Sequence, residues 1–219
     1  MNWDVIAKWF LLILFGYLLG SVMFCNIIAR KFGKKDLRKE SQDGNPGAAN
    51  LFWQCGKKLG TCGLVLDVLK GVVPVVLARI VFSGGDGLQY GVNATESFGF
   101  ALVMLSPVLG HAFPIFEKFK GGKCISTSLG VMTGLLGLSP AIFVLGPLDI
   151  FFSYIVKIKV GNVRAVVFYS LFVVIMAVIC FMNGEYMIFS GCTMVSALAI
   201  AKHLPLDADI SKVTKKGKK

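Results

Sequence analysis

Two polar loops of this sequence carry groups suited to holding an anion. The first, from Ser41 to Asn50, consists mostly of small and amide residues, Ser41-Gln42-Asp43-Gly44-Asn45-Pro46-Gly47-Ala48-Ala49-Asn50. This composition turns a backbone sharply and exposes its N–H groups. The second reads Lys118-Phe119-Lys120-Gly121-Gly122-Lys123-Cys124-Ile125-Ser126-Thr127-Ser128. Its adjacent glycines let a backbone approach an anion, its lysines supply charge, and its hydroxyls precede an apolar run that predicts a helix.

We therefore predict phosphate binding at these loops. The spacing differs from that of a P-loop, which requires GxxxxGK followed by Ser or Thr, so a nucleotide triphosphatase is not indicated. The alternative is that both loops are ordinary basic turns on one face of a membrane. Repetition of glycine, lysine and amide or hydroxyl groups in both loops favours a site.

Four ionisable residues in or beside apolar runs add candidates. Asp67 and Lys70 are three residues apart, so on a helix they share a face and form either a structural ion pair or part of a site. His111, shortly before Pro114, either orients a substrate or bonds a neighbouring loop. His203, at the end of the last apolar run, acts either in the site or as a helix cap.

The composition indicates that a membrane must position these loops. Of 219 residues, 55% are hydrophobic and only 16% are charged, with a formal net charge of +11. Soluble domains carry about 25% charged residues, so this composition excludes a soluble globular protein. Eighteen phenylalanines exclude a disordered chain. The basic residues lie between apolar runs and do not follow one face, so no nucleic-acid partner is expected.

Apolar runs predict an all-α integral membrane protein of about seven transmembrane helices. We place the helices at residues 9–29, 60–82, 97–116, 126–140, 141–156, 163–182 and 186–201. The fourth and fifth runs are short and rich in Gly and Pro, so a five-helix alternative stays open. We treat residues 1–203 as one membrane domain and residues 204–219 as a basic cytoplasmic tail.

The loop charges predict an orientation. Of the 23 basic residues, 20 fall on alternate loops and the tail. Lys and Arg accumulate on the cytoplasmic side, which places the N-terminus outside and the C-terminus inside. The six cysteines form no CxxC pattern and no Cys/His ligand set, so neither a structural disulfide nor a metal is expected. No cofactor is indicated, and the oligomeric state stays open.

Four motifs in order carry a resemblance to a known family. Gly44-Asn45-Pro46-Gly47-Ala48-Ala49-Asn50 resembles the GNxGAxN signature of the bacterial membrane glycerol-3-phosphate acyltransferases that use acyl phosphate, the PlsY family. Three further stretches are similar to that family, at residues 16–21, 66–71 and 110–123. Beyond residue 130 the likeness is weak apart from Lys202-His203.

The resemblance implies a seven-helix enzyme of the bacterial cell membrane with a cytoplasmic site. It would transfer an acyl group from acyl phosphate to the 1-hydroxyl of glycerol 3-phosphate, among membrane lipids. It implies catalytic roles for Ser41, Asn45, His111 and His203. It implies substrate or phosphate binding by Gly44, Gly47, Asn50, Lys70, Lys120, Gly121, Gly122, Lys123, Thr127 and Ser128.

The sequence also departs from the family pattern. Asp43 stands where the family has Ser, and Trp53 stands where it has Arg. Ser41 replaces the missing hydroxyl if the loop carries a one-residue insertion. Leu206 stands where a C-terminal motif has Asn. These departures leave a second reading, a catalytically altered family member that binds lipid or phosphate or transports it.

Overall fold

The chain folds into a bundle of helices. The computed structural model describes residues 3–41, 43–82 and 98–204, and within these ranges it contains helices and no strand. The helices are α1 (Trp3–Gly20), α2 (Phe24–Phe32), α3 (Leu37–Glu40), α4 (Ala48–Cys55), α5 (Lys57–Val81), α7 (Phe98–Ala112), η1 (Ile115–Glu117), α8 (Ile125–Gly134), α9 (Ala141–Ile150), the π-helical η2 (Phe151–Ile155), α10 (Gly161–Asn183) and α11 (Tyr186–His203). The expected all-α fold is confirmed.

The first apolar run is not the single helix that we expected over residues 9–29. It breaks after Gly20, and α2 begins at Phe24. Non-helical backbone in an apolar region is tolerated where its polar groups find partners within the protein. Here the carbonyl of Val22 accepts a hydrogen bond from Lys70 Nζ at 2.8 Å, and Ser21 N–H bonds the carbonyl of Tyr17 at 2.9 Å. The polar partner on α5 explains why hydropathy alone could not locate the break.

The other apolar runs form helices near the expected positions, with one difference in length. Helices α5, α7, α10 and α11 cover the second, third, sixth and seventh runs. The run at 126–140 yields only α8, whose ten residues span about 15 Å, half of a bilayer core. Among the described residues, three segments are long and apolar enough to cross a membrane, at Trp3–Phe32, Phe98–Glu117 and Gly161–Asn183. The count of seven stays a prediction.

Glycines bring the central helices into close contact. A Cβ on Gly110 of α7 would meet the backbone of Tyr17 in α1, and one on Gly20 would meet the backbone of Pro107. Between α5 and α8, a Cβ on Gly71 would strike the carbonyl of Thr127. Small residues allow such close approach between membrane helices, whose association depends on van der Waals packing because lipid removes the hydrophobic driving force. This packing fixes α8, and hence the second polar loop, against α5.

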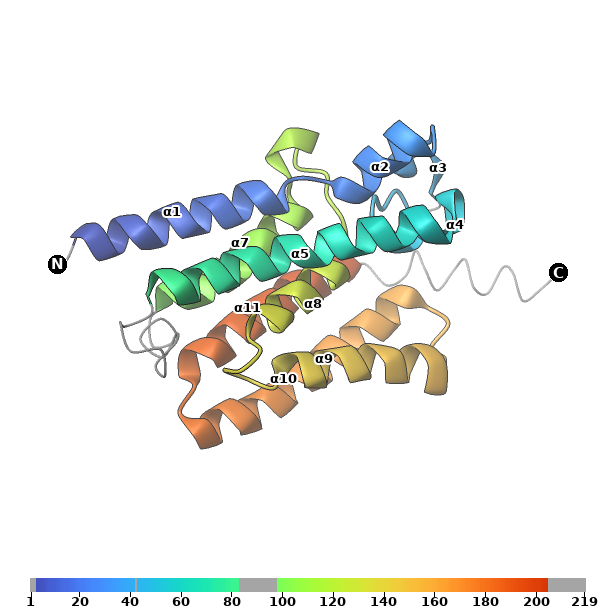
Figure 1. Ribbon diagram of the computed structural model, residues 1–219. Helices are drawn as coiled ribbons and strands as arrows, with labels where there is room; N and C mark the ends of the chain where they lie inside the picture. Colours follow the sequence, from blue (N-terminus) through green and yellow to red (C-terminus); the bar gives the residue numbers. More distant parts are fainter. Residues whose placement is uncertain (1–2, 42, 83–97, 205–219) are drawn as a thin grey trace.

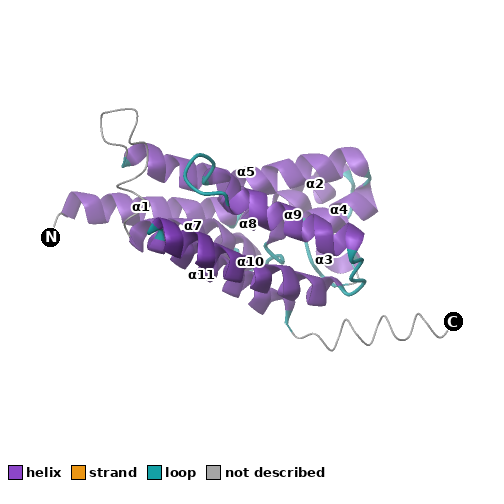
Figure 2. Ribbon diagram, turned by 90° about the horizontal axis from the view of Figure 1, so that it is seen from below, coloured by secondary structure: helices purple, strands orange, loops and turns teal. Residues whose placement is uncertain are grey.

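The short helices gather at one end of the bundle. Helices α1, α5, α7 and α11 run lengthwise, while α2, α3 and α4 lie together at the end away from the start of α1 (Figure 1). The view from below shows α2 and α4 together at the same end of the bundle (Figure 2). Below α2–α4 lies a small apolar core that includes Leu37, Ala48 and Leu51. The main core, with Phe100, Phe168 and Phe172, fills the rest of the bundle.

Candidate functional site

The first polar loop closes on itself through Asn50 and Asp43. Asn50 Nδ2 donates to the carbonyl of Asn45 at 2.7 Å and to Asp43 Oδ1 at 2.9 Å, while Asn45 N–H donates to the same Oδ1 at 3.2 Å. Gly44 has a φ of +64°, a left-handed conformation that glycine adopts freely. Gly47 is the N-cap of α4 and supplies no side-chain cap, so the first N–H groups of α4 are left for another partner.

The second polar loop lies directly on His111. Gly122 N–H donates to the carbonyl of His111 at 3.0 Å. A Cβ on Gly122 would collide with the imidazole Nε2, and one on Gly121 would collide with the carbonyl of His111. The paired glycines are therefore required by the histidine beneath them. Cys124, with φ +70°, then turns the chain into α8, which also begins without a side-chain cap.

Lys123 joins the two loops. Its ammonium lies 2.8 Å from Asp43 Oδ2 and 3.0 Å from Asn162 Oδ1 near the start of α10. Burial alone would raise the pKa of Asp43, but hydrogen bonds from Lys123 and Asn50 hold that pKa below its ordinary value. Asp43 is therefore ionised at neutral pH. The structure thus brings Asn45, Asn50 and Lys123 into one polar cluster through Asp43.

Several predicted site residues hold polar atoms with no partner among the described residues. These are the hydroxyls of Ser41 and Thr127, Oδ1 of Asn45 and Nδ1 of His111, each buried. The buried hydroxyl of Ser128 faces the hydroxyl of Tyr169. Thr127 and Ser128 lie in the first turn of α8, with their side chains inside the bundle. A buried polar atom without a partner is costly, so these positions are suited to receive a substrate or water.

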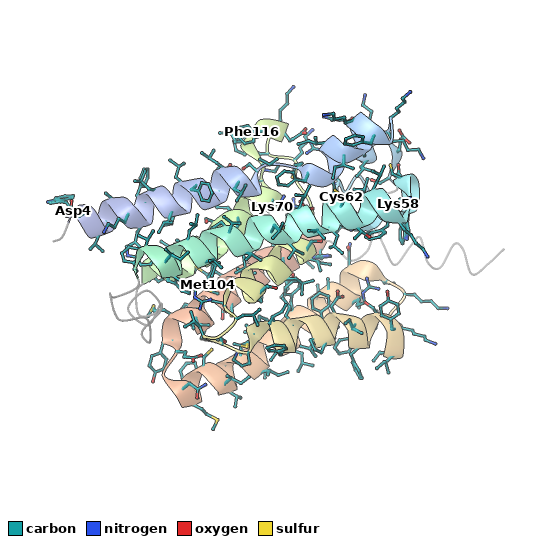
Figure 3. The ribbon with its side chains drawn as sticks, in the orientation of Figure 1. Asp4, Lys58, Cys62, Lys70, Met104 and Phe116 are labelled. Carbon is teal, nitrogen blue, oxygen red and sulfur yellow. The ribbon has the colours of Figure 1, made fainter. Side chains whose placement is uncertain are left out.

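Lys70 is part of a buried ion pair on α5. Its ammonium lies 2.9 Å from Asp67 Oδ1, and its side chain is 0% exposed. It also donates to Val22, while Cys25 Sγ donates to Asp67 Oδ2 at 3.2 Å. Figure 3 shows Lys70 on the middle part of α5, away from Lys58 at the end near α4. The structure shows the ion pair between Asp67 and Lys70, and the site role of Lys70 stays a prediction.

The C-terminal end of α11 contacts the C-terminal end of α7. Lys202 Nζ donates to the carbonyl of Ala112 at 3.1 Å and lies 4.8 Å from the ring centre of Phe113. His203 is buried, and its Nδ1 lies 2.7 Å from the carbonyl of Ala199 one turn earlier. This contact fits the helix-end reading of His203. Leu206 and the predicted tail lie outside the described residues.

A salt-bridge group outside the predicted site holds the segment between α7 and the second loop. The carboxylate of Glu117 in η1 lies 3.4 Å from Nη1 of Arg38 and 3.6 Å from Nη1 of Arg30. Arg30 also pairs with Asp36 at 3.0 Å. Lys120, predicted as a phosphate ligand, is exposed beyond this group. Figure 3 shows the neighbouring Phe116 at the outer tip of this segment.

Sequence reasoning missed two residues of the cluster and one of its supports. Asn162 lies 39 positions from Lys123 in the chain, in a region that carries no motif. Asp43 was noted only as a departure from a pattern, although its acidic side chain beside a lysine-rich loop was a usable signal. Lys202 was noted only as part of the Lys202-His203 likeness to the family, and nothing local predicted its contact with α7.

Comparison with known proteins agrees with this geometry. The sequence profile described as "Glycerol-3-phosphate acyltransferase" matches residues 10–212. A protein of that name from Syntrophotalea carbinolica is 32% identical over 200 residues, which cover 90% of this chain and 91% of the relative. One from Legionella pneumophila (strain Corby) is also 32% identical over 200 residues, but the match spans only 64% of that longer protein. One from Shouchella clausii is 46% identical over 126 residues, 58% of this chain and 56% of the relative.

Two solved structures share the fold. Crystal structures of PlsY, described as an integral membrane glycerol 3-phosphate acyltransferase, superpose with TM-scores of 0.75 for its glycerol 3-phosphate form and 0.71 for its lysophosphatidic acid form. Each is 26% identical and covers 95% of this chain and 93% of the solved chain. The profile spans nearly all of the described bundle and both polar loops. The chain is therefore an integral membrane protein of the glycerol-3-phosphate acyltransferase family.

Proposed function

We propose that this protein transfers a fatty acyl group from acyl phosphate to the 1-hydroxyl of glycerol 3-phosphate. The products are lysophosphatidate and inorganic phosphate, an early step of phospholipid synthesis. The observation that carries the proposal is the cluster in which Lys123, Asn45 and Asn50 converge beside the glycine pair that lies on His111. The relatives are named for this acyl acceptor, and one PlsY structure is of a glycerol 3-phosphate form.

In this reaction the protein mainly has to position the two substrates and stabilise the negative charge of the phosphate. The acceptor oxygen attacks the acyl carbon, the bond from that carbon to the phosphate oxygen breaks, and the proton of the hydroxyl leaves with the phosphate. Because acyl phosphate is already activated, no serine or cysteine nucleophile is required. Lys123 and the free N–H groups at the starts of α4 and α8 would stabilise phosphate charge. His111, with an unpartnered Nδ1, would orient the reacting groups.

Thr127 and Ser128 complete the proposed site. Both are buried at the start of α8, where the Thr127 hydroxyl has no partner among the described residues and the Ser128 hydroxyl faces that of Tyr169. They would donate to a phosphate or to the acyl carbonyl. Ser41, also unpartnered and at the end of α3, would serve the acceptor side together with Asn45. Lys120 would attract anions from solution, and Lys70 and His203 keep their predicted roles in the site.

The departure at Trp53 does not block the cluster. Its indole is 85% exposed on the surface of α4, so it does not fill the cluster, and the guanidinium that the family has at this position would have to be replaced by Lys123. We propose the membrane of a bacterial cell as the location, because the bundle belongs to an integral membrane family and the relatives are bacterial. Acyl phosphate fits such a location, since its chain would stay in lipid while its phosphate meets the polar loops.

The test is an assay of purified protein in lipid nanodiscs with labelled glycerol 3-phosphate. Acyl phosphate is expected to give labelled lysophosphatidate, whereas acyl-CoA and free fatty acid give none. Glycerol in place of glycerol 3-phosphate is expected to give no acylated product. Binding of acyl phosphate without any turnover would instead support the altered, non-catalytic reading of the family fold.

A further inference from the structure

The carboxylate of Asp43 occupies a position built for an anion. Its Oδ1 accepts hydrogen bonds from the side-chain amide of Asn50 and from Asn45 N–H, and its Oδ2 contacts the ammonium of Lys123. An amide, a backbone N–H and an ammonium are also the donors that bind a phosphate oxygen. We call these three donors the anion cradle. The chain thus places one of its own acidic groups in the cradle.

Among the described residues, Lys123 is the cation in contact with Asp43. Arg38 contacts Glu117 through Nη1, Lys70 pairs with Asp67, and Lys202 donates to the carbonyl of Ala112. With Asp43 in place, the charges of Asp43 and Lys123 cancel. The second partner of Lys123 is the neutral amide of Asn162, at 3.0 Å, which remains compatible with a bound phosphate.

We propose that Asp43 is an internal competitor for the anion cradle, and that a phosphate group displaces its carboxylate from Lys123 when it binds. The side chain of Asp43 is 30% exposed, so its carboxylate is able to turn toward water without being buried unpaired. Lys123 stays anchored by Asn162 during the exchange. The proposal deepens the proposed function, because it takes the displacing group to be the phosphate of a substrate.

Displacement of Asp43 would make it a residue that sets substrate affinity. A serine at this position would leave the charge of Lys123 uncompensated in the empty site. The aspartate instead lowers the affinity of the anion cradle for every anion, because each anion must first displace the Asp43 carboxylate. A phosphate group carries enough negative charge to do so. Weakly bound anions such as chloride would therefore compete poorly.

Calorimetric titration of the full chain in nanodiscs with inorganic phosphate tests the proposal. Asp43→Asn keeps the shape of the side chain and removes its charge, so phosphate is expected to bind about tenfold more tightly. Asp43→Ser is expected to tighten binding in the same direction and serves if Asp43→Asn does not fold. Asp36→Asn is the matched control, because Asp36 pairs with Arg30 outside the cradle and its amide retains the helix cap. This control is expected to leave phosphate affinity unchanged.

A second comparison isolates Lys123. In a Lys123→Met background, Asp43→Asn is expected to give no gain in phosphate affinity, because the contested cation is gone. Unchanged or weaker binding in folded Asp43→Asn and Asp43→Ser would overturn the proposal, as would an equal gain in Asp36→Asn. Phosphate binding can be measured without turnover, so the effect of Asp43 on phosphate affinity can be tested even if the protein is inactive. If the protein is active but Asp43→Asn shows no gain in affinity, only this inference is contradicted, and the proposed function stands.

Discussion

At Gly122 the absence of a side chain is what allows the second loop to lie on His111. Gly122→Ala would place a methyl group against Nε2 of the imidazole. Since the glycine backbone is also bonded to the carbonyl of His111, the loop must move away. We expect a loss of about 1–3 kcal/mol in stability and a drop in acyl transfer of at least about tenfold. Thermal unfolding and initial rates measure the two effects.

Gly146→Ala is the control for Gly122. Gly146 lies in α9 with open space where a Cβ would stand, so alanine there is expected to leave both activity and stability intact or slightly raised. Normal activity in Gly122→Ala would contradict the placement of the loop on the histidine.

Single residues also mark what the sequence could and could not tell. The glycine pair, the lysine and the amide loop were predicted as anion-binding groups from their chemistry, and the structure joins them through Lys123. Asn162 was beyond such prediction, because its contact depends on how α10 packs beside the loop. Lys70 lies in a motif of the family, and its three-residue spacing from Asp67 already predicted the ion pair that the structure shows.

Within α5, the buried pair of Asp67 and Lys70 connects this helix to the break between α1 and α2. Asp67→Asn leaves the Lys70 ammonium in the bundle without its counter-charge, and removal of one partner of a buried pair costs about 3–5 kcal/mol. We expect a matching fall in unfolding free energy in detergent. The double variant Asp67→Asn with Lys70→Met should recover much of that loss. A double variant no more stable than Asp67→Asn alone would contradict the account.

Between α7 and α11, Lys202 is predicted to keep His111 in place. Lys202→Met removes the hydrogen bond to Ala112, which follows His111 directly. We expect kcat to fall by about tenfold with little change in phosphate affinity, because the cradle itself is untouched. Lys202→Arg should retain most of the rate. Steady-state kinetics distinguish these outcomes, and unchanged kcat in Lys202→Met would remove Lys202 from the positioning role.

Hydropathy located most helices, because long apolar runs leave few alternatives. It missed the break at residues 21–23, where the backbone depends on Lys70 from another helix. It also overestimated the length of α8, because the run at 126–140 contains turn residues that end the helix at Gly134. The first error occurs where a polar contact from another helix decides the backbone, and the second where local turn residues do.

For the whole molecule, the loop charges predict the N-terminus outside and the C-terminus in the cytoplasm. A green fluorescent protein fused after Lys219 is expected to fluoresce, and alkaline phosphatase inserted between Asp86 and Glu96 is expected to be active. The reverse pattern would place both polar loops on the outer face, where cytoplasmic acyl phosphate could not reach them.

The central claim is that the cluster joined by Lys123 performs acyl transfer. The most direct measurement is the yield of lysophosphatidate and inorganic phosphate from acyl phosphate and glycerol 3-phosphate, for the parent and for Lys123→Ala. The account predicts equal amounts of both products from the parent and a rate reduced by about a hundredfold or more in folded Lys123→Ala. Failure of the parent to form lysophosphatidate, or equal rates in the parent and Lys123→Ala, would contradict it.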